Sequence, residues 1–330
     1  MRTPDLTTID QYRRLFSDAS YWSPFVKAVC EKHGLGPVHA IKTCDVPGTY
    51  PVFNVDDKWI VKFFGIHFDG QRTFAVELEV NQLLSGVHDL PRPKLVAHGH
   101  LLENCDNCRW PYLVFEFVQG RSLGEVREKL SSDEKVEIAR TVGKIARCLH
   151  SVEMSSTVVL KPTWESYCDM ISKQSIACAS RHKEWSSLPD RLINQIDDFL
   201  PPIEEIVDHS SMPSLLHGDL TVDHVLVVRD DSKWKLKAVI DYGDAIVGDP
   251  MYELVALHLD LFKCNKDLLM EYLSAYGSLE RIGSKMARKL LSLCLLFPFN
   301  IFHDLFEIDP SASKVSSLGE LADRLWNTEI

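Results

Sequence analysis

Residues 215–227 read LLHGDLTVDHVLV, in which an apolar run, a polar cluster and a second apolar run follow one another. Short apolar runs bounded by polar residues predict strands. A polar loop between two strands is held rigidly, and rigid loops are where proteins place reacting side chains. We therefore expect Asp219, in the middle of this loop, to carry chemistry.

A second segment of the same kind occupies residues 238–244 and reads AVIDYGD, so that an apolar strand ends in Asp241. Phosphoryl transfer needs one carboxylate for the attacking hydroxyl, another for Mg²⁺, and a lysine held by a glutamate. In protein kinases the catalytic Asp precedes a metal-binding Asn by five residues, and the second Asp begins Asp-Phe-Gly. Here Asp219 precedes His224 by five residues and Asp241 begins Asp-Tyr-Gly, in the same order.

These two segments, with the Gly-Asp-Pro at 248–250, resemble the aminoglycoside phosphotransferase family, which includes choline, fructosamine and hydroxylysine kinase relatives. The resemblance covers residues 40–262 and takes in IVKF at 60–63, ELEVNQLL at 77–84, LPRPKL at 90–95 and YLVFEFVQGRSL at 112–123. It implies an α+β fold of the bilobal protein-kinase-like type. The N-terminal lobe would be small, with five strands and one helix, and the C-terminal lobe mainly helical.

The resemblance also implies the roles of individual residues in an ATP-dependent transfer to a hydroxyl of a small molecule. Asp219 would be the catalytic residue, and Asp241 the main Mg²⁺ ligand, with His224 at the second metal position. Lys62 would contact the α- and β-phosphates of ATP and pair with Glu77. The other nucleotide-binding positions would be the backbone of Glu116, Phe117 and Val118, which would bond the adenine, and Gly48 and Thr49 in the phosphate loop.

Two departures from the family pattern lead to an alternative function. The family has Asn where His224 stands, and imidazole suits Mn²⁺ or Zn²⁺ better than Mg²⁺. Either the second metal site is weaker here, with Mn²⁺ as an alternative ion, or another group such as Asp223 contributes. The phosphate loop holds only one glycine, Gly48. The alternative is therefore a nucleotide-binding pseudokinase or scaffold with little catalysis.

The partner of Lys62 can be chosen between two carboxylates on one predicted helix. Glu77 and Glu79 cannot share a helix face because they are two residues apart. One should point inward, and the distance from Glu77 to Leu84 suits the family pattern better. Taken alone, Lys62 is equally consistent with a solvated edge strand and Glu77 with a surface charge.

Local patterns predict the elements and their boundaries. Strands are expected at 38–44, 51–55, 58–64, 95–102, 112–118, 225–229 and 235–241, and a helix at 72–85. Ser23-Pro24 predicts a helix start and Gly34 its end. Further helices are expected at 131–150, opened by a capping box of Ser131 and Glu134, and at 163–182, 189–200, 251–262, 266–276 and 281–297. The predicted domains are 1–118, an N-terminal lobe with a helical extension, and 119–330, a helical C-terminal lobe.

Other polar residues allow competing interpretations. His98, His100, Cys105 and Cys108 have the composition of a Zn²⁺ site, but Asp106-Asn107 is good turn chemistry in a hairpin. Asp249 directly before Pro250 predicts a helix N-cap rather than a metal ligand. The acidic side chains that would suit an amine-bearing acceptor are Glu253, Asp260, Asp304 and Glu307.

Composition excludes several classes of protein. The formal net charge is −11, which disfavours nucleic acid as a partner. No secretory signal is expected, and the apolar stretch from Leu290 to Phe302 is too interrupted to span a bilayer. Nine cysteines without framework spacing indicate thiols in a reducing cytoplasm. A protein kinase is the last alternative, because only eight residues separate Asp241 from Pro250. The oligomeric state is left open.

Overall fold

The computed structural model of the chain describes residues 4, 6, 8–44, 48–101, 110–207, 209–210, 212–277 and 281–329. These residues fall into two units. The first comprises Met1–Arg127, Asp223–Asp230 and Leu236–Asp244, and the second comprises Glu128–Val222, Asp231–Lys235 and Ala245–Ile330. The first unit therefore extends past the predicted boundary at residue 118 and takes in two later segments.

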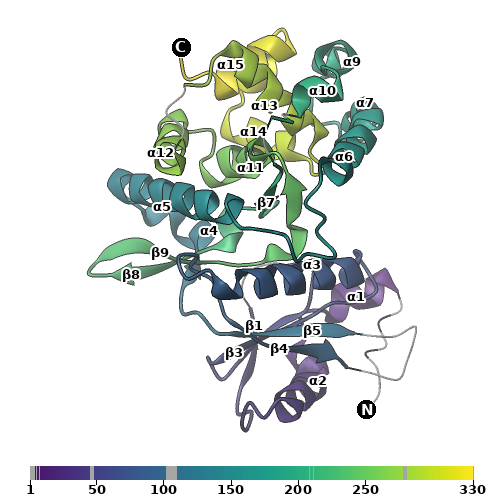
Figure 1. Cartoon of the computed structure of the whole chain (residues 1–330), viewed down its shortest axis with the longest axis vertical. Helices are drawn as coiled ribbons and strands as arrows, with labels where there is room; N and C mark the ends of the chain where they lie inside the picture. Colours follow the sequence, from purple (N-terminus) through teal and green to yellow (C-terminus); the bar gives the residue numbers. More distant parts are fainter. Residues whose placement is uncertain are drawn as a thin grey trace. The chain divides into compact units, whose positions relative to one another are not determined.

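A five-stranded sheet forms the centre of the first unit (Figure 1). Four of its strands lie within the ranges that the sequence predicted, and the fifth, β5, begins one residue before its predicted range of 112–118. The order is β1-β2-β3-β5-β4, with antiparallel pairing throughout. Helix α3 (Gly70–Leu83) is inserted between β3 and β4. The strand bounds are β1 (Ile41–Thr43), β2 (Val52–Val55), β3 (Trp59–Phe63), β4 (Leu95–His100) and β5 (Pro111–Glu116).

The two faces of this sheet are covered by different helices, as Figure 1 shows. Helix α2 (Ala19–Lys32) packs on one face, where Trp22 stacks on Phe63 with ring centroids 4.8 Å apart. Helix α3 covers the other face, where Phe74 packs with Leu113. Because side chains alternate along a strand, Lys62 projects to the α3 face while its neighbour Phe63 joins the α2 face.

The N-terminal extension forms two helices, α1 (Ile9–Leu15) and α2. The predicted start of the second helix at Ser23-Pro24 is wrong. The helix begins at Ala19, because the Asp18 carboxylate accepts hydrogen bonds from two backbone amides of the first turn. Pro24 lies inside the helix, whereas Gly34 follows its end with a φ of +63°, as expected.

A second, three-stranded sheet brings later segments into the first unit. It contains β6 (Arg121–Ser122), β8 (Val225–Asp230) and β9 (Lys233–Val239), in the order β6-β8-β9, and β6 leads into α4 (Leu123–Val126). The amide of Val239 donates to the carbonyl of Pro91 at 2.8 Å, and the amide of Ile240 donates to the carbonyl of His224 at 3.0 Å. These bonds fix the start of β8 and the end of β9 against the first unit.

Helices make up most of the second unit. The capping box is confirmed, since Ser131 and Glu134 bond each other's backbone at the start of α5. The helices are α5 (Ser132–His150), α6 (Trp164–Ile176), α7 (Cys178–Trp185), α8 (Asp190–Ile193), α9 (Ile196–Phe199), α10 (Ile203–Ile206), α11 (Glu253–Ala256), α12 (Lys266–Tyr276), α13 (Ser284–Leu296), α14 (Ile301–Ile308) and α15 (Leu318–Trp326). A short antiparallel pair, β7 (Ser214–Leu216) with β10 (Ile246–Gly248), lies in this unit.

The apolar stretch from Leu290 to Phe302 begins in helix α13, which is buried from Leu290 to its end at Leu296, close to Pro298 as expected. Its last carbonyls accept hydrogen bonds from the guanidinium of Arg181 and the ring of His182 on α7. In the part of the chain that the structure describes, none of the helices combines the length and apolarity that crossing a membrane requires.

A buried histidine in the second unit predicts a pH dependence of stability. Burial lowers the pKa of His258 to about 4, and its Nε2 donates to the carbonyl of Leu325 at 2.9 Å. A histidine whose pKa is lower in the folded state stabilises the fold above its unfolded pKa of about 6.5. We expect the free energy of unfolding to fall by about 3 kcal/mol between pH 6.5 and pH 4.

Urea unfolding at several pH values measures this dependence. His258→Asn removes the titrating group and keeps a side-chain N–H near Leu325, so the stability of the variant should change less over the same pH range. An equally steep decline in this variant would show that His258 is not the source.

Candidate functional site

Lys62 lies in the middle of β3, with β2 on one side and β5 on the other. It is therefore not an edge-strand lysine, and the whole residue is only 5% exposed. Its Nζ donates to Oε2 of Glu77 at 2.7 Å and to Oδ1 of Asp241 at 2.7 Å. One buried ammonium thus joins the sheet, helix α3 and the segment that follows β9.

The two carboxylates keep this ammonium charged. Burial by itself would lower the pKa of Lys62, but Asp241 and Glu77 outweigh it and hold the pKa above its ordinary value. Burial raises the pKa of Glu77 to about 7, although the adjacent Lys62 ammonium opposes the rise. A buried charge persists only when it is paired, so the lysine and its two partners depend on one another.

Helix α3 presents Glu77, not Glu79, to the lysine. Glu77 is 2% exposed, whereas Glu79 is half-buried. The preceding turn of the same face carries Thr73, whose methyl group leaves no room for a side chain at position 243. A Cβ added to Gly243 would lie 2.6 Å from the Thr73 Cγ2. The glycine of the Asp-Tyr-Gly run thus permits close packing against α3.

Asp241 has a left-handed backbone with φ of +64°, a conformation that Asp tolerates through local hydrogen bonds. One such bond runs from the amide of Gly243 to Oδ1 at 3.4 Å. The other carboxylate oxygen, Oδ2, lies 3.9 Å from Nε2 of His224. To a divalent ion these two residues would offer one carboxylate oxygen and one imidazole nitrogen.

The loop that carries Asp219 lies in the second unit, after β7. Gly218 has a φ of +82°, and the amide of Asp219 donates to Nδ1 of His217 at 3.3 Å. Two carboxylates hold the backbone of this loop. Glu253 accepts from the amides of His217 at 2.7 Å and Gly218 at 3.3 Å, and Asp260 accepts from the amide of Val222 at 2.8 Å.

Glu253 is 1% exposed, and its charge is balanced inside the second unit. Burial alone would raise the pKa of its carboxyl. The proximity of His150, whose Nε2 lies 3.6 Å from the carboxylate, and of His217, with the bond from the His217 amide, lowers the pKa below its ordinary value. Glu253 is therefore too buried and too fully engaged by the loop to bind an amine-bearing acceptor, whereas that expectation stays a prediction for the partly exposed Asp260. Asp304 and Glu307 remain exposed on α14.

The Gly-Asp-Pro run that follows has a structural role in the second unit. Asp249 is the predicted N-cap and accepts from the amide of Met251 at 2.9 Å. It also pairs with Lys289 at 3.1 Å. Gly248 lies against the ring of Tyr167, and an added Cβ would approach that ring to 2.2 Å. Residues 248–250 therefore serve packing and capping where the chain passes from β10 to α11.

The predicted adenine-binding residues end β5 and follow it. The amide of Glu116 donates to the carbonyl of Lys94 at 2.9 Å, and the amide of Phe117 donates to the carbonyl of Lys58 at 2.8 Å. These two amides are thus engaged within the first unit. Among the described residues, the amide of Val118 makes no backbone hydrogen bond and is the remaining N–H donor of the three.

The predicted phosphate loop and the predicted zinc site each adjoin residues that the structure does not describe. Gly48 and Thr49 are exposed and precede β2. His98 and His100 lie on β4, but Cys105 and Cys108 lie outside the described residues, so the zinc interpretation stays a prediction. The seven described cysteines are free thiols.

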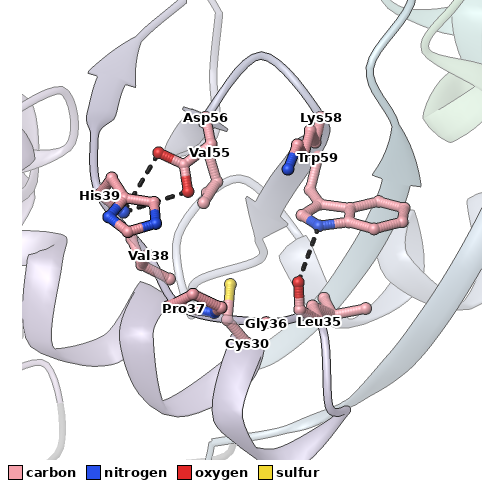
Figure 2. Close-up of a pocket in the computed structure, with 10 residues that line it drawn as sticks. All are labelled: Cys30, Leu35, Gly36, Pro37, Val38, His39, Val55, Asp56, Lys58 and Trp59. Atoms are coloured by element: carbon pink, nitrogen blue, oxygen red, sulfur yellow. Dashed lines mark hydrogen bonds between the residues drawn. The ribbon is translucent and has the colours of Figure 1, made fainter.

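A small cavity of about 90 Å³ lies elsewhere in the first unit (Figure 2). The β2–β3 turn, with Asp56 and Trp59, meets the loop after α2 there, and the carboxylate of Asp56 accepts from the amide of His39. Trp59 packs with the α2 side of the sheet, the face opposite Lys62. This cavity is therefore separate from the lysine and its carboxylates.

The structure thus brings Lys62, Glu77, Asp241 and His224 together in the first unit, and it places Asp219 on a braced loop of the second. Sequence reasoning missed the role of the carboxylates that hold this loop. A signal for one of them was present, since Glu253 stands in the apolar run Tyr252 to Leu257. A lone carboxylate in such a run must be buried, and a buried carboxylate needs donors.

Comparison with known proteins agrees with this arrangement. The fold is of the protein-kinase-like type found in aminoglycoside phosphotransferases, which confirms the predicted fold class. A sequence model of the phosphotransferase enzyme family matches residues 49–284. The chain belongs to this phosphotransferase enzyme family.

Three solved structures illustrate the likeness of fold. The GDP and kanamycin complex of APH(2″)-IIIa has a TM-score of 0.65 at 19% identity, covering 83% of this chain and 89% of that chain. The streptomycin–ATP–APH(2″)-IIa ternary complex has a TM-score of 0.57 at 17% identity, covering 92% and 98%. APH(3″)-Id from Streptomyces rimosus, with ADP and streptomycin, has a TM-score of 0.56 at 15% identity, covering 84% and 98%.

A curated relative is much longer than this chain. Lysine-specific demethylase JMJ21 of Arabidopsis thaliana is 22% identical over 270 residues, which cover 66% of this chain. The matched region is 29% of the length of that demethylase. The likeness therefore concerns one part of the longer protein.

Proposed function

We propose that the chain transfers the γ-phosphoryl group of ATP to a hydroxyl of a small molecule. The observation that carries this proposal is the buried contact of the Lys62 ammonium with Glu77 and Asp241, both at 2.7 Å. Phosphoryl transfer requires a lysine held by a helix glutamate beside a metal-binding aspartate. A purely structural ion pair of Lys62 with Glu77 would not require the second, half-buried carboxylate of Asp241.

In this proposal each residue has a separate task. Lys62 neutralises phosphate oxygens, Glu77 holds it in place, and the Val118 amide bonds the adenine. Asp219 accepts the proton of the attacking hydroxyl, on a loop whose backbone is fixed by Glu253. Asp241 and His224 hold the divalent ion, which when bound neutralises charge on the phosphates.

The test is ADP release by the purified chain with ATP and Mg²⁺ or Mn²⁺, in the presence of a panel of amino alcohols, amino sugars and neutral sugars. Acceptor-dependent release of ADP supports the proposal. Thermal stabilisation by ATP without turnover would favour the alternative of a nucleotide-binding protein with little catalysis. The absence of both stabilisation and turnover would contradict both functions.

The imidazole of His224 predicts which metal the protein uses, and the same assay measures it. Because His224 offers nitrogen where the family has an amide oxygen, we expect Mn²⁺ to support turnover better than Mg²⁺. His224→Asn should lower the ratio of Mn²⁺-supported to Mg²⁺-supported activity by about tenfold. An unchanged ratio would remove His224 from the metal site and leave Asp241 as the ligand.

A further inference from the structure

Tyr12 joins the N-terminal extension to the segment before β2. It lies on α1, is 1% exposed, and its hydroxyl donates to the carbonyl of Thr49 at 2.6 Å. Its ring is enclosed by aromatic neighbours, with centroids 5.1 Å from His67 and 6.5 Å from Trp110. A buried hydroxyl with a short bond of this kind fixes the carbonyl that accepts it.

A second tyrosine, Tyr50, links the segment before β2 to the β3–α3 loop and to α3. The hydroxyl of Tyr50 donates to the carbonyl of Phe68 at 2.6 Å and is hydrogen-bonded to the hydroxyl of Thr73 at 3.0 Å. Phe68 has a φ of +56°, a strained conformation for an aromatic residue, and its ring lies 5.9 Å from that of Tyr12. The β3–α3 loop is thus shaped to receive both tyrosines.

These contacts end at the lysine and the metal-binding segment. The ring of Tyr50 lies 5.7 Å from Nζ of Lys62, and Thr73 packs against Gly243. A continuous chain of contacts in the first unit therefore runs from α1 through residues 49 and 50 to the residues that the proposed function assigns to phosphate and metal.

We propose that Tyr12 is a positioning residue of the nucleotide site, which makes α1 part of that site. By holding the Thr49 carbonyl, Tyr12 keeps the backbone of Gly48 and Thr49 in the place where it meets the phosphates. This inference rests on the proposed function, because Lys62 and this backbone must act on one nucleotide. It extends the site to a helix that lies outside residues 49–284, the part matched by the family model.

The experiment compares binding of ATP, ADP and adenosine to the full chain and to Tyr12→Phe by calorimetry with Mn²⁺. Loss of one buried hydrogen bond should weaken binding of ATP and ADP by about five- to tenfold. Adenosine, which has no phosphates, should bind both proteins equally. Hydrogen exchange of the amides of residues 49 and 50 should become faster in the variant.

Tyr112→Phe is the matched control. Tyr112 is fully buried in the same unit, and its hydroxyl bonds to Nε2 of His33 at 2.8 Å rather than to Thr49. Its removal should change stability like the Tyr12 variant but leave nucleotide binding unaltered. If the unaltered chain binds ATP and Tyr12→Phe binds it equally well, or loses adenosine as much as ATP, the inference is overturned. If the unaltered chain binds no ATP, the proposed function itself fails, and the inference with it.

Discussion

Asp219→Asn is expected to lower acceptor-dependent ADP release by about 10³-fold. The substitution keeps the size of the side chain but removes the carboxylate that, in the proposed function, accepts the proton of the attacking hydroxyl. The loop itself should persist, because its backbone is held by Glu253 and Asp260 rather than by residue 219. Steady-state kinetics with saturating ATP measures the loss, and thermal unfolding checks the fold.

Asp198→Asn provides the control for this change. Asp198 is an exposed acid on α9 in the same unit, so its substitution removes the same charge without touching the loop. Its turnover should equal that of the unaltered chain. Turnover that survives in Asp219→Asn would exclude Asp219 as the proton acceptor and require another group for that role.

The fold was predictable where a pattern is local. The alternation of β3 and β5 places successive residues on opposite faces, and the capping box of Ser131 and Glu134 needs only four consecutive residues. The start of α2 was missed because two good start signals compete in the sequence. Asp18 lies before Pro24, and its carboxylate reaches two amides, which outweighs the proline preference for the first turn.

The candidate site was predictable where it depends on charged side chains. Asp241 could be named from its motif and spacing, and Lys62 and Glu77 from the resemblance to the family, because each must supply a charge of one sign at one place. What could not be named are contacts made by the backbone over long separations. The amides that Glu253 holds are 35 and 36 residues away in sequence, and the carbonyl that Tyr12 holds is 37 away. Because nearly every residue carries the same backbone amide and carbonyl, the sequence does not show which of these groups make such a contact.

Residues 116–118 show the same limit. The sequence identifies residues 116–118 as a strand end, but it does not tell which amides the sheet already uses. Pairing of Glu116 with Lys94 and of Phe117 with Lys58 depends on the register of neighbouring strands. Register is set by the whole sheet and not by the three residues themselves.

Lys62→Met is expected to abolish nucleotide turnover and to lower the free energy of unfolding by about 3–5 kcal/mol. The change leaves Glu77 buried without its cation, whereas Asp241, with its side chain 35% exposed, is partly screened by water. Urea unfolding measures the stability, and ADP release measures the activity. Stability within the error of the unaltered chain would show that the ion pair is not coupled to the fold.

The double variant Lys62→Met with Glu77→Met separates stability from function. Replacement of a whole buried ion pair by apolar side chains of similar volume is often neutral or stabilising, so the double variant should regain most of the lost stability. Its turnover should stay as low as that of Lys62→Met, because the phosphates would still lack their ammonium. Regained turnover in the double variant would mean that Lys62 serves the fold alone. A double variant no more stable than Lys62→Met would instead indicate that Asp241, not Glu77, carries the destabilisation, and the triple change including Asp241→Asn would then restore it.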